Sequence, residues 1–245
     1  MNRYYYDLHI HSCLSPCGGD DMTPNNIAGM GVLNGLNIMA LTDHNTTKNC
    51  PAFFKAAKKQ GIIPIAGMEL TTAEDIHAVC LFPSLESAME FDSFVEKHRM
   101  MIPNRTDIFG FQYIMNENDE VVGEDANLLS MATDIMIDDV YEIVKSQGGI
   151  CYPAHVDRDA NGIITTLGTF PDYSGFKVAE FHDGKKISSY EDKYTALRDK
   201  IKVVSSDAHY LWDIKEKNEY FELDDEPYSS KLVTQRLFEY LGALE

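Results

Sequence analysis

The sequence lacks any long apolar run. No part of its 245 residues approaches the roughly 18–20 uninterrupted apolar residues that a membrane-spanning helix needs. Residues 1–6 also lack the apolar core of a signal peptide. We therefore expect a cytoplasmic protein that makes no use of a membrane.

Positive charge is scarce, because 21 Lys and Arg residues face 39 Asp and Glu residues and the formal net charge is -18. Nucleic-acid backbones are normally bound by clustered Lys and Arg, so this composition argues against general affinity for nucleic acid. It leaves a phosphate substrate open, since bound cations can invert the sign of a local site.

The five cysteines show no complete metal-binding or disulfide pattern. Cys13 and Cys17 resemble half of a zinc knuckle, but no second closely spaced pair follows among Cys50, Cys80 and Cys151. Reduced thiols are the better interpretation.

Short apolar runs alternate with amphipathic stretches along most of the chain. Strands are expected at 4–10, 38–42, 62–66, 76–81, 149–152, 176–180 and 201–205, and helices at 27–33, 49–60, 138–146, 188–197 and 229–241. Thr23 and Pro24 provide an N-cap and a first helical residue, and Gly35 provides a stop. This alternation predicts right-handed βαβ units, a parallel sheet and a single α/β domain over residues 1–245.

The alternation of expected strands and helices is interrupted between residues 84 and 133. Residues 91–101 resemble a helix, but 102–125 mix Pro103, Gly110 and Gly123 with many polar residues. We expect an inserted segment over one face of the scaffold, either a lid or a solvated connection.

Seven of the eight histidines lie at or just beyond an expected strand. Asp7, His9 and His11 alternate along the first strand, and a period of two directs all three side chains to one face. Burying three polar side chains on an inward face costs free energy unless they bind a ligand. The alternative is three independently hydrogen-bonded polar residues.

Other expected strands also end in carboxylates and imidazoles: Asp43, His44, Glu69, His77, His155, Asp207 and His209. Functional groups gather at the carboxyl ends of strands in parallel α/β folds. Imidazole and carboxylate without thiolate suit Zn, Mn or Fe, and the number of ligands favours two or three ions that share a bridging carboxylate. Such ions clamp phosphoryl oxygens and lower the pKa of a bridging water.

These segments resemble, in order, the motifs of the PHP (polymerase and histidinol phosphatase) family: residues 7–12 (DLHIHS), 41–45 (LTDHN), 67–69 (GME), His77, 153–155 (PAH) and 206–209 (SDAH). The resemblance extends from about residue 4 to residue 210. It implies a distorted (β/α)7 TIM-like barrel that holds up to three metal ions.

The resemblance also implies which residues hold each ion. The first would be bound by His9, His11, Glu69 and Asp207, and Glu69 would bridge to a second at His77 and His155. The third would use His44, His209 and a carboxylate from the loop after the first strand. Here Gly19 occupies the position where that acid often stands, so Asp20 is our choice and Asp21 the second choice.

Further roles are assigned around this site. Asp7 and Asp43 are expected to orient an imidazole or the strand rather than bind metal. Arg158, whose guanidinium fork suits phosphate, is expected to bind substrate, with a surface salt bridge as the alternative. Arg105 is a weaker candidate for phosphate, and His182 for a rim or acid–base role. Catalysis itself is assigned to Glu69, Asp207, His209 and Arg158.

We expect a free-standing enzyme that hydrolyses a phosphate monoester, of a small metabolite or a nucleotide, with a metal-activated water. One alternative is a non-catalytic, metal-stabilised binding module, and another is an exonuclease-type phosphodiesterase acting on oligonucleotide ends. Amidohydrolase-like chemistry normally needs a lysine at a strand end, which the motifs do not contain. The substrate, the native metal and the oligomeric state stay open.

Overall fold

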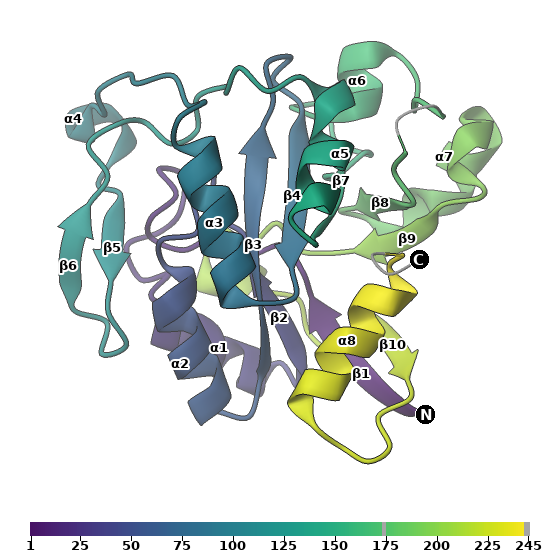
Figure 1. The fold of residues 1–245 in the computed structure, drawn as a ribbon, viewed down its shortest axis with the longest axis horizontal. Coiled ribbons are helices and arrows are strands. Elements are labelled where there is room, and N and C mark those ends of the chain that lie inside the picture. The colour runs from purple at the N-terminus through teal and green to yellow at the C-terminus, as the bar shows by residue number, and fades with distance from the viewer. Residues whose placement is uncertain (173–174, 243–245) are drawn as a thin grey trace.

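The computed structural model describes residues 1–172 and 175–242. Six strands form a curled half-barrel sheet in the order β10-β1-β2-β3-β4-β7 (Figure 1). Their bounds are Asn2–Asp7 (β1), Ile38–Leu41 (β2), Ile63–Thr71 (β3), His77–Phe82 (β4), Ile150–Pro153 (β7) and Tyr220–Leu223 (β10). A separate parallel pair consists of β8 (Val178–Phe181) and β9 (Ile201–Val204). The fold is therefore mixed α/β, and the finer count of a (β/α)7 barrel stays a prediction.

The prediction of a wholly parallel sheet is wrong at three junctions. β1, β2 and β3 are parallel, but β4 is antiparallel to both β3 and β7, and β10 is antiparallel to β1. The physical reason at β3–β4 is the connection, because residues 72–76 are too few for the crossover that parallel neighbours require. Asp75 completes that turn with a φ of 59°. β10 was not predicted.

Helices α1 (Pro24–Leu33), α2 (Cys50–Lys59), α3 (Leu85–Val95) and α5 (Ile137–Ser146) pack against the sheet around one apolar core. The predicted start of α1 is confirmed, since the Thr23 side chain accepts a hydrogen bond from Asn26 N and Pro24 is the first helical residue. Gly35 follows the helix with a φ of 74°, a conformation that favours glycine. Each helix thus covers one side of the sheet through its apolar stripe.

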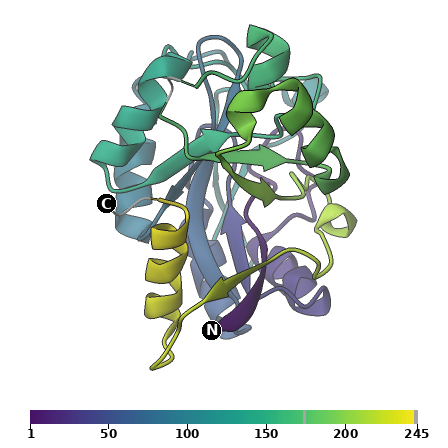
Figure 2. The same cartoon turned by 90° about the vertical axis from the view of Figure 1, so that its right-hand side faces the viewer.

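A second apolar core contains Leu8, just after β1, Ile65 of β3 and Tyr152 of β7 together with residues of α8 (Ser230–Tyr240). Leu237 and Phe238 of α8 are almost completely buried there. Figures 1 and 2 show α8 and β10 at the end of the molecule where the N-terminus lies.

The inserted segment is shorter than predicted. Helix α3 ends at Val95 instead of extending over 91–101, and its Phe91 and Val95 are fully buried in the core, so it belongs to the scaffold. The projecting part contains α4 (Thr106–Phe109), β5 (Tyr113–Met115) and β6 (Val121–Glu124), at the left of Figure 1. Tyr113 N donates to Cys13 O, which attaches this part beside the loop that follows β1.

The expected helix at 188–197 is divided into α7 (Ile187–Lys193) and the 3₁₀ turn η2 (Thr195–Leu197). The remaining short elements are α6 (Ile163–Leu167), η1 (Gly184–Lys186) and η3 (Leu211–Asp213). In the described ranges, no helix is both long enough and apolar enough to span a bilayer.

The β8–β9 pair borders the six-stranded sheet both beside β1 and just after β7, where Val156 N donates to Glu180 O, and no strand ladder joins β1 to β9. Lys215 crosses this junction: its backbone N donates to Asp7 Oδ2 (3.3 Å), and its Nζ donates to the backbone oxygens of His182 (2.7 Å) and Ser205. Just beyond the strands, His11 N also donates to Ala208 O at 2.9 Å.

Candidate metal centre

Glu69 lies near the end of β3, and its buried carboxylate faces five imidazoles. The oxygen-to-nitrogen distances are 3.2 Å to His9 Nε2, 3.2 Å to His11 Nε2, 3.0 Å to His44 Nδ1, 2.8 Å to His77 Nδ1 and 3.1 Å to His155 Nε2. A carboxylate has only about four lone-pair sites, so five imidazoles exceed what hydrogen bonding to it requires. Such crowding of donor atoms is typical of a metal centre.

Asp207, just after β9, supplies a second carboxylate. Its Oδ1 lies 3.4 Å from His9 Nε2 and 3.2 Å from His11 Nε2. Asp207 has a φ of 53°, His155 of 28° and Asn45 of 50°, and each follows closely on a strand. Non-glycine residues in this region cost about 1–3 kcal/mol each and cluster at functional sites, where the surrounding fold holds them.

The outer ring nitrogens of three histidines are held by polar neighbours. His9 Nδ1 is 2.8 Å from Glu180 Oε1, and His209 Nδ1 is 2.8 Å from Asp207 O. His11 Nδ1 is 2.9 Å from Ser15 Oγ, which itself donates to Asp43 Oδ1. With the proton on Nδ1 in each ring, the Nε2 lone pair is directed away from these partners, as a metal ligand requires.

Electrostatics within the cluster are strong. Burial opposes protonation of His11, but hydrogen bonds and charge from Asp207 and Glu69 outweigh it and raise the pKa of His11 to about 9. Burial likewise opposes protonation of His44, and the nearby Cys17 thiol and Glu69 raise the pKa of His44 to about 9. Protonated His11 and His44 thus compensate the negative charge of Glu69 and Asp207, which a bound cation could compensate in their place.

Two other groups of the cluster, Glu69 and His209, have lowered pKa values. Burial would raise the pKa of Glu69, but His77, His9 and His44 hold it well below its usual value. Burial and the charge on His11 lower the pKa of His209 to about 3. His209 is therefore a neutral imidazole, the form that binds metal.

The donor set fits divalent ions. Three groups of side chains have ligand atoms within 4.8 Å of one another: His9, His11, Glu69 and Asp207; His44, Glu69 and His77; and His11, His44 and His209. Among the described residues, the buried atoms His44 Nδ1 and Glu69 Oε2 lie 3.0 Å apart without the alignment of a hydrogen bond, and the buried His155 Nδ1 has no hydrogen-bond partner. Nitrogen and oxygen donors in this number suit Zn, Mn or Fe.

Asp7 and Asp43 lie behind this cluster. β1 ends at Asp7, before the expected end at residue 10, so His9 and His11 stand beyond the strand. His9 and His11 converge on Glu69, whereas Asp7 Oδ1 accepts from Ser206 N at 3.0 Å. Asp43 accepts from Ser12 N and from the Ser12 and Ser15 hydroxyls, at 2.7 Å each. Both carboxylates therefore fix backbone and loop.

The structure does not bring Asp20 or Asp21 into the cluster. Both are exposed, and neither belongs to the three groups of potential ligands found in the described chain. Gly19 explains part of this arrangement, because a Cβ on Gly19 would lie 3.1 Å from Cδ1 of Tyr210. The ring of Tyr210 thus fills the space beside this loop where a longer side chain would stand.

Arg158 and His182 stand at the edge of the cluster. Arg158 donates to Asp207 Oδ2, its second Nη lies 3.1 Å from His182 Nδ1, and its side chain is 37% exposed. Burial and the charge on Arg158 lower the pKa of His182, so its ring is neutral near pH 7. Arg105 is elsewhere, paired with Asp107 on exposed α4.

Two residues in contact with this centre, Glu180 and Ser15, were missed in the sequence, as was Lys215, which bonds Asp7 behind the centre. Glu180 lies inside β8, and besides His9 its Oε1 accepts from His155 N at 3.1 Å. A fully buried acid in an otherwise apolar strand was the available signal. Ser15 and Lys215 gave no such signal, because both stand in polar loops.

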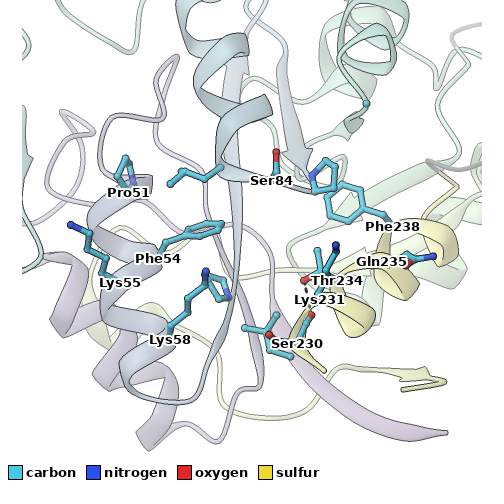
Figure 3. Close-up of a pocket in the computed structure, with 15 residues that line it drawn as sticks. Pro51, Phe54, Lys55, Lys58, Ser84, Ser230, Lys231, Thr234, Gln235 and Phe238 are labelled. Carbon is cyan, nitrogen blue, oxygen red and sulfur yellow. Dashed lines mark hydrogen bonds between the residues drawn. The ribbon is translucent and has the colours of Figure 1, made fainter. Parts of the chain in front are cut away.

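A separate groove of about 690 Å³ lies between α2 and α8, and Figure 3 shows residues from both helices pointing toward it. Phe54, Ile63 and Phe238 contribute apolar surface, and Lys58 and Lys231 are basic. Ile63 and Pro64 begin β3, so the groove is about 17 Å of strand away from Glu69 at ~3.3 Å per residue. It is therefore distinct from the candidate metal centre.

Solved structures share this fold. A lesion-specific endonuclease, EndoQ, from Pyrococcus furiosus superposes with a TM-score of 0.69 at 19% identity, over 96% of this chain and 55% of that one. A protein from Bifidobacterium adolescentis assigned as a metal-dependent phosphoesterase gives 0.59 at 19% identity, over 95% of each chain. At these identities the likeness is one of fold.

Curated proteins match over shorter segments. The chain is 36% identical over 77 residues to an error-prone DNA polymerase of Symbiobacterium thermophilum and 39% identical over 61 residues to a PolC-type DNA polymerase III of Thermotoga petrophila. These segments are 31% and 25% of this chain, and only 7% and 4% of the polymerases. The family profile of the PHP domain matches residues 7–168, well over half of the sequence. The chain belongs to the PHP domain family of metal-dependent phosphoesterases.

Proposed function

We propose that this protein hydrolyses a phosphate monoester of a small metabolite or a nucleotide. The observation that carries the proposal is the set of five imidazoles around the buried Glu69 carboxylate. His9, His11, Glu69 and Asp207 would hold one ion, and Glu69 would bridge to a second at His77 and His155. When bound, ions in such a site lower the pKa of water between them and neutralise charge on phosphoryl oxygens.

The third position is the least complete. His44 and His209 would supply imidazoles, and the loop after β1 offers Asp20 or Asp21 as the carboxylate. Neither acid is grouped with His44 and His209 in the described chain, so binding there would require one of these exposed side chains to turn toward the two imidazoles. We therefore propose two tightly held ions and a weaker third.

Arg158 is the proposed phosphate-binding residue. Its guanidinium now pairs with Asp207, and an ion on Asp207 would take over that charge and release Arg158 toward the substrate. His182 would hold the second Nη of Arg158 in place as a neutral ring, a positioning role that fits its lowered pKa. The acidic net charge of -18 supports a small substrate over a polyanion.

The test is metal analysis of the purified protein followed by assays with p-nitrophenyl phosphate and a panel of sugar phosphates and nucleoside monophosphates, with Mn, Zn and Fe supplied in turn. We expect at least one ion to support turnover. Protein that carries metal yet leaves every ester intact would favour the non-catalytic binding module.

A phosphodiester substrate is the second candidate. It is supported by the DNA polymerase relatives and by EndoQ, which has been solved with a 27-mer duplex containing an abasic lesion. Bis(p-nitrophenyl) phosphate and short oligonucleotides separate the two functions. Faster release of nucleotides from oligonucleotide ends than of phosphate from nucleoside monophosphates would favour the diesterase.

A further inference from the structure

Tyr210 and Trp212 form an exposed aromatic pair next to the candidate metal centre. Their rings are stacked, with centroids 5.4 Å apart and planes 4° from parallel. Tyr210 is 43% exposed and Trp212 is 73% exposed, although aromatic rings of this size are normally covered. Trp212 is the single tryptophan of the sequence.

The pair continues directly from the cluster. Tyr210 follows His209, whose ring stacks on His11 at 4.2 Å, and the three residues from His209 to Trp212 span at most about 11 Å. On its other side, Tyr210 packs against Gly19, and Gly19 N donates to His209 O at 2.9 Å. The two rings therefore form a wall at the edge of the centre, within reach of a molecule bound there.

Neighbouring residues hold this wall in place. Leu211 packs against the main core and Ile214 is buried in it, so both sides of the short turn η3 are anchored. Asp213 N donates to Tyr210 O at 2.9 Å, which closes the turn between the two aromatic residues. Tyr210 and Trp212 are thus presented to solvent by a fixed backbone, the arrangement of a preformed binding surface.

The geometry points to a base-stacking platform: the outer face of Trp212, backed by the ring of Tyr210, stacks on the planar heteroaromatic ring of a nucleoside phosphate whose phosphate lies at the metal centre. This inference rests on the proposed function and narrows its substrate class. Stacking on aromatic side chains needs no positive charge, so it suits a chain with a net charge of -18 and an acid, Asp213, inside the turn. That acidity disfavours a long strand and favours a single nucleotide.

A binding experiment tests the platform independently of turnover, because Trp212 is the chain's own fluorophore. Metal-loaded protein is mixed with AMP in a stopped-flow fluorimeter and, in parallel, with ribose 5-phosphate, which carries the same phosphate without a base, and the quenching reached before turnover is compared. Quenching by AMP but not by ribose 5-phosphate supports the platform. Equal or absent quenching overturns it.

Kinetics of variants provide the second measurement. Trp212→Ala should lower kcat/KM for AMP about 5- to 100-fold through KM, while activity on ribose 5-phosphate, which has no planar ring to stack, stays unchanged. Trp212→Phe should restore most of the preference. Phe111→Ala is the matched control, since Phe111 is also exposed (45%) and stacked, on Tyr113, but does not adjoin His209.

The possible outcomes separate the two proposals. Base-selective quenching in a protein that is inert toward every ester would uphold the platform and reject hydrolysis. An unchanged AMP preference in Trp212→Ala would reject the platform while hydrolysis stands. If Trp212→Ala changed only the oligomeric state, the pair would be a protein interface and the inference would be wrong.

Discussion

The candidate metal centre and the α2–α8 groove differ in the charge and polarity of the side chains that form them. The centre gathers buried acids and imidazoles that contact one another, on backbone that includes strained residues such as His155 and Asp207. The groove is lined by apolar side chains and lysines, and no acid is among the described residues that line it. We therefore expect substitutions at the centre to change the chemistry and those at the groove to change the stability of the fold.

The largest expected effect follows from removing one charge at the centre. Glu69→Gln keeps the size of the side chain but loses the negative charge that faces five imidazoles, so it should lower kcat/KM by about 10³-fold or more and reduce bound metal. Activity assays and metal analysis by mass spectrometry measure both. Glu86→Gln, an exposed acid on α3, is the control and should behave like wild type. Retained turnover in Glu69→Gln would refute the bridging role.

A smaller effect is expected one layer out. Glu180→Gln keeps an acceptor for His9 Nδ1 but removes its charge, and it should weaken metal affinity about 10- to 100-fold. Isothermal titration with Mn²⁺ measures the affinity, and circular dichroism checks that the fold is intact. Wild-type affinity in a folded Glu180→Gln protein would show that this contact is only structural.

The stability of the metal-free protein and its affinity for metal should depend on pH in opposite ways. His11 and His44 have folded pKa values of about 9, raised from 6.5. Their contribution to the stability of the metal-free protein is therefore complete below pH 6.5 and is lost as the pH rises through 9. Metal must displace these protons, so its affinity should rise about tenfold per pH unit for each histidine over the same range. Melting temperature and affinity that moved in the same direction would contradict this coupling.

The smallest effect on catalysis is expected at the groove. Phe54→Ala removes a half-buried ring from α2 and should cost about 1–2 kcal/mol of unfolding free energy, less than the ~3–5 kcal/mol of a fully buried phenylalanine. Turnover should not change. Urea denaturation and the phosphatase assay check the two halves of this prediction, and a large loss of kcat with normal stability would link the groove to the centre.

The sequence predicted the convergence of histidines well because their positions follow from strand ends. Glu69, His155 and Asp207 stand at or just after strands, and the structure brings all three to one place. The family profile confirms the resemblance from which the ligand sets were taken. The ligand assignments themselves stay predictions.

What the sequence did not reveal depends on long-range pairing. β10 has only four residues and pairs with β1 more than 200 positions away, so no local pattern marked it. The strand β4 was predicted, at residues 76–81, but its antiparallel direction was not, because alternating elements favour parallel crossovers. Glu180 was missed because its role depends on a contact with His9, far away in the sequence.

The ligands of the candidate metal centre come from both the six-stranded sheet and the β8–β9 pair. His9, His11 and Glu69 belong to the large sheet and its extensions, whereas Asp207 and His209 follow β9 of the small one. Ions held by both sets would add a link across a joint that buried apolar residues such as Val178 and Val203, and hydrogen bonds such as that from Ser206 N to Asp7 Oδ1, already hold. Loading with metal should then slow deuterium exchange in β8 and β9 more than in β2 and β3. Bound ions would in that case stabilise the packing of the small sheet against the large one, in addition to their part in the reaction.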